Sequence, residues 1–295
     1  MTKKSQNLNY QFIMMNKYFL STPSVSSAFF KYYSPVRCVS AWIILFSFVT
    51  NGVFCQNDSL RGRVSMSIEL EKHPYFTGYS TGLEYARKAK DWRNVWLIKA
   101  QQAERFGLKS SIIQSEWYPK INKSRYACLG LSVSDGQIFP KYHAAAHLMQ
   151  NLHGGVEVEG GVRFISVKSN EAAWVFIGGA IKYWRNYLFN AKVYIAQGSV
   201  LKGQTFTFAT RYYMKDEVSY FWLQVGTSRS AQIETINPFM FNDLTLNSQW
   251  LQVGVNRQLT PKWVLRTSGH LERFNAANNP FQYRILGSLQ IGYLF

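Results

Sequence analysis

The chain has 295 residues, of which 47% are hydrophobic and 16% aromatic, and its mean hydropathy is −0.17. It is too polar for a bundle of membrane helices, yet long enough for a single all-β barrel domain. The formal net charge is +17. No basic helix or nucleic-acid-binding motif accompanies this charge, so we expect no nucleic-acid partner.

The first segment that stands out is the apolar run 39–55, which follows Lys31 and Arg37 and contains no acid. It is shorter than the roughly 20 residues of a spanning helix and is typical of a secretory signal. We therefore predict a signal peptide over 1–55. The stretch before the run is long for such a signal, so an over-extended start, with the true one at Met14 or later, is an alternative. A second alternative is acylation of Cys55, which bulky Phe54 disfavours.

After a short periplasmic lead, 56–62, apolar and polar residues alternate in segments separated by turn residues, as in membrane-spanning strands. In one of these segments Val156 and Val158 share a face, and Glu157 and Glu159 share the other. Alternation of this kind predicts strands with one apolar and one polar face. The predicted strands are 63–71, 79–88, 95–106, 109–118, 125–134, 143–152, 156–167, 173–184, 187–197, 204–213, 220–228, 246–258, 263–274 and 281–295.

These segments predict an all-β fold, a transmembrane antiparallel barrel over 63–295 with about 14 strands. An even number of strands places both termini on the periplasmic side of a bacterial outer membrane. The connections on that side are then short, and the longest connection, 229–243, lies outside. Twelve strands are an alternative, because the patterns of 63–71 and 143–152 are the weakest. A soluble two-sheet β protein would show similar alternation.

The last predicted strand, 281–295, ends on an aromatic residue with no tail. Its apolar face is predicted to be the C-terminal signal for the barrel-assembly machinery, and consists of Leu289, Ile291, Tyr293 and Phe295. Aromatic residues near strand ends predict girdles at the two membrane interfaces, and these are Trp117, Tyr118, Trp184, Tyr187, Tyr212, Tyr213, Tyr220, Trp250, Trp263 and Tyr293.

Three short motifs, ERFG at 104–107, EWYPKI at 116–121, and SD at 134–135 followed by IFPK at 138–141, resemble the YaiO family of outer-membrane β-barrels. The resemblance extends over about 78–295. It departs from the family pattern at Gln114, where an acid is usual, and at Tyr142-His143, where His-Arg is usual. The resemblance implies an outer-membrane barrel and, because the family looks like one without an established activity, no particular reaction.

If the apolar faces contact lipid, the polar faces line the lumen. Charges of both signs there predict either a salt-bridged scaffold or a selectivity filter. The filter would favour anions if Arg163, Lys192, Arg211 and Arg284 lay together without acids. The lumen-lining candidates are Lys99, Arg105, Glu116, His143, His147, Glu157, Glu159, Arg163, Lys192, Arg211, Arg266 and Arg284, and the same face is also expected to carry Glu69, Glu71, Glu84, Glu272 and Lys182.

The function predicted from these features is that of a monomeric narrow pore or envelope scaffold with a mixed-charge lumen, passing a small polar or anionic solute. The alternative is a lipid-modifying enzyme using His143 and His147, which share a strand face. The sequence contains no HExxH motif or Cys/His cluster, and we expect no metal, no cofactor and no catalytic residue. Basic residues near the rim are expected to bind lipopolysaccharide phosphates, and these are Lys72, Lys88, Lys109, Lys168, Lys202 and Arg229.

Overall fold

The computed structural model describes residues 62–89, 94–166, 172–198, 202–214, 218–229, 247–275 and 281–295. The predicted signal peptide and Lys168 lie outside these ranges. No helix of the described residues is long and apolar enough to cross a membrane.

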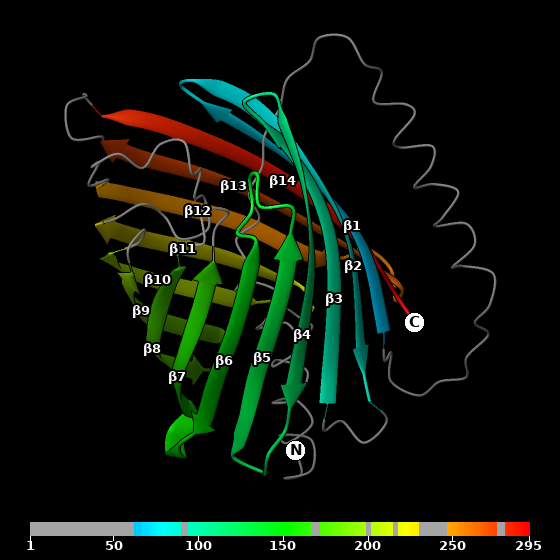
Figure 1. Cartoon of the computed structure of the whole chain (residues 1–295). Helices are drawn as coiled ribbons and strands as arrows, with labels where there is room; N and C mark the ends of the chain where they lie inside the picture. Colours follow the sequence, from blue (N-terminus) through cyan, green and yellow to red (C-terminus); the bar gives the residue numbers. More distant parts are fainter. Residues whose placement is uncertain are drawn as a thin grey trace.

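Within these ranges, fourteen antiparallel strands form one closed barrel, in which each strand pairs with its neighbours in the chain and β14 pairs with β1 (Figure 1). This confirms the prediction of a 14-stranded barrel, and the alternative of twelve strands is wrong. The strands are β1 (Gly62–His73), β2 (Phe76–Lys88), β3 (Asn94–Arg105), β4 (Leu108–Pro119), β5 (Arg125–Ser134), β6 (Tyr142–Asn151), β7 (Val156–Ser166), β8 (Ala172–Trp184), β9 (Tyr187–Gly198), β10 (Gly203–Tyr213), β11 (Tyr220–Arg229), β12 (Asn247–Gln258), β13 (Trp263–Asn275) and β14 (Gln282–Leu294).

The seam of the barrel lies between the first and last strands. The backbone nitrogen of Gly62 donates to the carbonyl of Phe295 at 2.8 Å, and the nitrogen of Phe295 donates back to Gly62 at 3.0 Å. A Cβ on Gly62 would lie only 2.5 Å from the Phe295 ring, so glycine lets this ring lie against the backbone. We call the end of the barrel that holds Gly62 and Phe295 the terminal end, and the opposite end the distal end.

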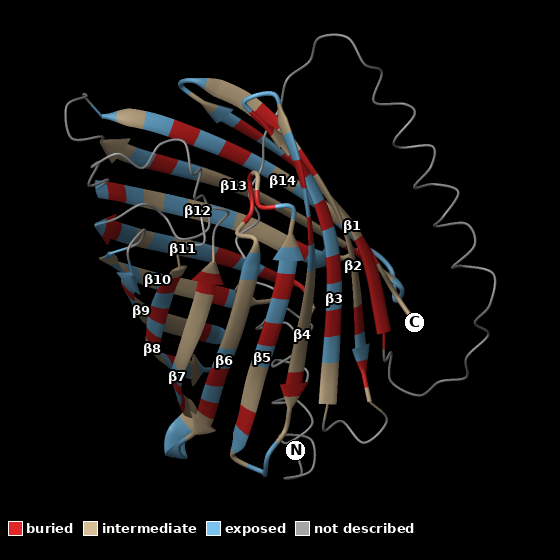
Figure 2. Cartoon of the chain, viewed as in Figure 1, coloured by how far each residue is buried: buried red, intermediate tan, exposed pale blue. Residues whose placement is uncertain are grey.

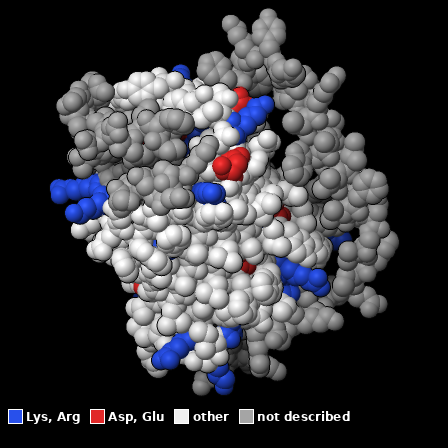
Figure 3. Space-filling view, in the orientation of Figure 1, with Lys and Arg blue, Asp and Glu red and all other residues white. Residues whose placement is uncertain are grey.

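Burial alternates along the strands because neighbouring side chains point to opposite sides of the wall (Figure 2). In β1, Ile68 is 44% exposed whereas Glu69 is 3% exposed. The face of the barrel seen in Figure 3 is largely uncharged, and its few Lys and Arg side chains are scattered over it. A wide apolar belt of this kind is covered by lipid in a membrane barrel, whereas a soluble monomer rarely exposes one.

Aromatic rings on the outer face form contacts near the terminal end. Trp96 stacks on Trp117 with 5.2 Å between ring centroids, and Tyr187 contacts Tyr212 at 5.1 Å. The predicted girdle included four residues that point inward instead. These residues lie on the same strand face as buried polar side chains, and their closeness to a strand end does not predict which face they occupy. They are Tyr118, Tyr213, Tyr220 and Trp250.

Candidate functional site

The lumen collects the charged side chains predicted to line it. Fourteen strands about 4.8 Å apart and tilted by about 40° give a backbone cylinder roughly 28 Å across. Every candidate lies on the inward face, buried or half-buried: Lys99 and Arg105 on β3, Glu116 on β4, His143 and His147 on β6, Glu157, Glu159 and Arg163 on β7, Lys192 on β9, Arg211 on β10, Arg266 on β13 and Arg284 on β14.

The first cluster, near the distal end, is centred on Glu71, which is 2% exposed. One carboxylate oxygen lies 3.4 Å from Nε of Arg105, and the other lies 3.5 Å from Nε of Arg284. Arg284 in turn lies 3.2 Å from Glu272. The cluster therefore ties β1, β3, β13 and β14 together on both sides of the seam.

The second cluster is centred on Glu159. Its carboxylate contacts Nδ1 of His147 at 2.8 Å and Nζ of Lys192 at 2.7 Å. Nε of Arg163 donates to Nε2 of His147 at 3.4 Å. Because Nε2 accepts this hydrogen bond, the network assigns the imidazole proton to Nδ1, which donates it to Glu159.

Three other inward-facing acids bond to neighbouring side chains along the wall. Glu84 pairs with Arg63 at 2.5 Å, Glu157 accepts from the Tyr126 hydroxyl at 2.6 Å, and Glu116 accepts from the Tyr118 hydroxyl. Each partner lies on the same strand or no more than two strands away around the barrel. Removing the partner of a buried charge strongly destabilises a protein, so these bonds stabilise the inner wall.

Three inward-facing guanidinium groups contact aromatic rings, and the first is that of Arg163, whose Cζ lies 5.8 Å from the Tyr194 ring centroid. Cζ of Arg211 lies 5.2 Å from the Tyr220 ring centroid, and Cζ of Arg266 lies 5.7 Å from that of Trp222.

The predicted anion filter required four cations together without acids, but Lys192 contacts Glu159 and Arg284 contacts Glu71 and Glu272. Those four cations therefore do not form an acid-free cluster.

Two basic residues do not lie where the sequence predicted them. Lys182 points outward, and its ammonium donates to the carbonyl of Gly154 at 2.6 Å. The inward face of β8 is apolar, with Val175 and Ile181 almost completely buried, so polarity alone misassigns the face of this strand. Lys88 is 2% exposed and points inward, which removes it from the predicted lipopolysaccharide contacts.

A stretch of uncharged side chains completes the inner wall over β10–β14. Gln224 and Gln252 pair across β11 and β12. These side chains are all partly exposed, so packed side chains do not completely fill this part of the interior. The prediction from the sequence considered only charged residues on this face and therefore did not include them. They are Thr207, Gln224, Gln252, Ser268 and Ser288.

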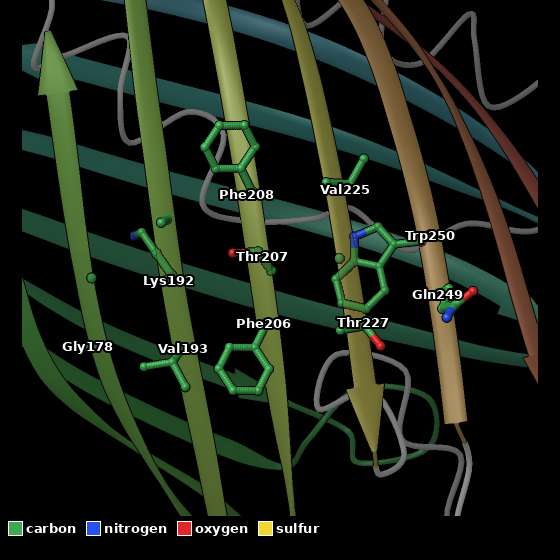
Figure 4. A pocket seen from close by; sticks show the side chains of 13 residues that line it. Gly178, Lys192, Val193, Phe206, Thr207, Phe208, Val225, Thr227, Gln249 and Trp250 are labelled. Carbon is green, nitrogen blue, oxygen red and sulfur yellow. The ribbon is translucent and has the colours of Figure 1, made fainter.

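A pocket of about 680 Å³ lies along β8–β12, and small residues such as Gly178, Gly179 and Gly226 line it (Figure 4). Most of its lining is apolar and belongs to the outer face, including Phe206 and Phe208. Its inward-facing lining residues are Gly179, Lys192, Thr207, Gly226 and Trp250.

The connection between β5 and β6 folds onto the inner wall near the distal end. Ile138 and Phe139 are buried against Ala103 and Ile112, which face inward from β3 and β4. Asp135 accepts from the hydroxyl of Ser110, the backbone nitrogen of Ser111 at 3.0 Å and that of Gln137 at 3.1 Å. The Ser134-Asp135 and Ile138-Phe139 motifs thus hold this loop inside the distal mouth.

The C-terminal residues predicted to signal assembly lie on the outer face of β14. Leu289 and Ile291 are 47% and 41% exposed. The Tyr293 ring contacts Trp263 edge-on at 5.1 Å, and Phe295 stacks against Tyr85 at 6.2 Å. Among the described residues, no group of three or more His, Cys, Asp or Glu side chains could hold a metal ion.

Comparison with solved structures shows the fold. A bacterial polysaccharide outer membrane secretin is 8% identical, with a TM-score of 0.54 over 81% of this chain and 100% of the other. The CymD monoaromatic hydrocarbon channel is also 8% identical, with a TM-score of 0.53 over 81% and 89%.

No curated protein matches the chain. A family model described as the YaiO membrane beta barrel domain matches residues 69–232, which is more than half of the chain. The match includes the ERFG, EWYPKI and IFPK motifs, and extends from β1 beyond β11. The chain is therefore a bacterial outer-membrane β-barrel that belongs to the YaiO family.

Proposed function

We propose that this barrel is a narrow, water-filled pore for small polar solutes. The observation that carries the proposal is the partial exposure of Thr207, Gln224, Gln252, Ser268 and Ser288 on the inward face. Uncharged polar side chains that contact water can exchange hydrogen bonds with a passing solute. This exchange does not require the desolvation of a charged group.

The charged part of the lumen supports a pore with weak preference for the sign of an ion. Glu71, Glu159 and Glu84 each contact a basic group at 3.5 Å or less. Paired charges largely cancel each other's electric field at the centre of the lumen, whereas a ring of charges of one sign would select strongly between cations and anions.

The β5–β6 connection supports a narrow rather than a wide opening. It places Ile138 and Phe139 inside the mouth and is bonded to the wall through Asp135. Side chains that project into a barrel from a loop reduce the cross-section open to solutes.

Planar-bilayer recording of the purified barrel tests the proposal. We expect steady single-channel steps, and a reversal potential close to zero under a tenfold KCl gradient. Silence of a correctly folded protein would contradict the pore and leave an envelope scaffold. A large reversal potential would contradict the effect assigned to the paired charges.

A further inference from the structure

Two tryptophans face the lumen from neighbouring strands, and each lies over a glycine of the other strand. Trp250 of β12 pairs with Gly226 of β11, and Trp222 of β11 pairs with Gly254 of β12. A Cβ on Gly226 would lie 2.1 Å from the Trp250 ring, and a Cβ on Gly254 would lie 2.5 Å from Nε1 of Trp222. Each indole therefore occupies the space that a side chain would need, and rests against the wall.

The two rings differ in what covers them. Trp222 is 4% exposed and has the guanidinium of Arg266 5.7 Å from its centroid. Trp250 faces inward and is only half-buried, and with Thr207 and Lys192 it is among the few inward-facing residues of the pocket, whose lining belongs mostly to the outer face (Figure 4). Trp222 is therefore part of the packed wall, whereas Trp250 offers ring surface to a ligand.

Most of the polar groups near Trp250 are uncharged, although Glu272 pairs directly with it and Lys192 lines the same pocket. Gln252 lies two residues along its strand, Gln224 pairs directly with Gln252, and Thr207 pairs with Gly226. His270 pairs with Gln252 from the other side, and its Nε2 has no hydrogen-bond partner in the described structure. The nearest charge across the ladder is Glu272, which is bonded to Arg284 at 3.2 Å.

We propose that Trp250 is the stacking platform of a subsite for a neutral saccharide. The electron-rich face of an indole attracts the weakly positive C–H groups on one face of a sugar ring. The amides of Gln224 and Gln252 and the hydroxyl of Thr207 can donate to and accept from its hydroxyl groups. The inference rests on the proposed pore, because the sugar reaches Trp250 through the lumen.

The test is saturable block of the ion current by maltotriose, with a polyethylene glycol of similar size as the comparison solute. We expect maltotriose to block with a defined half-blocking concentration, and the glycol to reduce current without saturation. Trp250→Ala should raise the half-blocking concentration about tenfold, the value of one aromatic stacking contact. Gly226→Ala should do the same, since the added methyl group displaces the ring.

Trp222→Phe is the matched control, and should leave the half-blocking concentration within about twofold. If Trp250→Ala and Gly226→Ala fold but block like the unaltered protein, the platform is wrong. Maltotriose binding is also measured by calorimetry in detergent, which needs no current. Conduction without sugar binding overturns this inference and leaves the pore; silent bilayers with binding that depends on Trp250 overturn the pore and support the inference.

Discussion

Glu71→Ala should destabilise the barrel by about 3–5 kcal/mol, because it leaves Arg105 and Arg284 buried beside each other without the carboxylate between them. Both arginine side chains are at most 10% exposed, so water replaces the lost partner poorly. Urea unfolding of the protein in lipid vesicles, followed by tryptophan fluorescence, measures the change.

Glu104→Ala is the matched control for that experiment. Glu104 pairs with Lys109 at 3.7 Å on the outer face, and the lysine side chain is 67% exposed. An exposed ion pair contributes at most about 1 kcal/mol, and the hydrogen bond that the Tyr79 hydroxyl donates to Glu104 at 3.2 Å contributes about as much, so this variant should lose clearly less stability than Glu71→Ala. Equal stability of the Glu71→Ala and Glu104→Ala variants would contradict the role given to the distal cluster.

The combined substitution Ile138→Ser and Phe139→Ser should release the β5–β6 loop from the inner wall. Each loss of a large buried apolar side chain costs about 2–5 kcal/mol. A total of about 5 kcal/mol shifts the ratio of docked to undocked loop more than a thousandfold. Because the released loop no longer fills the mouth, single-channel conductance should rise, with larger current fluctuations.

Gln137→Ala provides the comparison for the loop. It keeps the backbone N–H that donates to Asp135, and so should leave the conductance unchanged. If the double serine variant conducts like Gln137→Ala, the loop does not narrow the pore.

The strands could be predicted from the sequence because alternation between a lipid face and a polar face is a strong constraint. Arg125–Ser134, for example, was predicted with the bounds that the structure gives to β5. The inward acids of β7 were also predicted correctly, because Val156 and Val158 alternate with Glu157 and Glu159.

The inner wall could be predicted only in part. On β8, Val175 and Ile177 point inward and Lys182 points outward, since the register with β7 and β9 fixes the face whatever the polarity of the residues. The Glu71 cluster joins side chains from strands that are far apart in the chain, so no local sequence pattern predicts which charged residues contact each other. The position of Trp250 over Gly226 likewise depends on the pairing of β11 with β12.

The central claim is that the uncharged polar face of β10–β14 borders water while the next residue along the strand borders lipid. Ser288→Cys and Leu289→Cys test it directly, in a background where the native Cys38, Cys55 and Cys128 are replaced by Ala. A charged, water-soluble thiol reagent added to the barrel in lipid vesicles should modify the Ser288→Cys variant rapidly and spare the Leu289→Cys variant. Rapid modification at position 289 with protection at 288 would contradict the account.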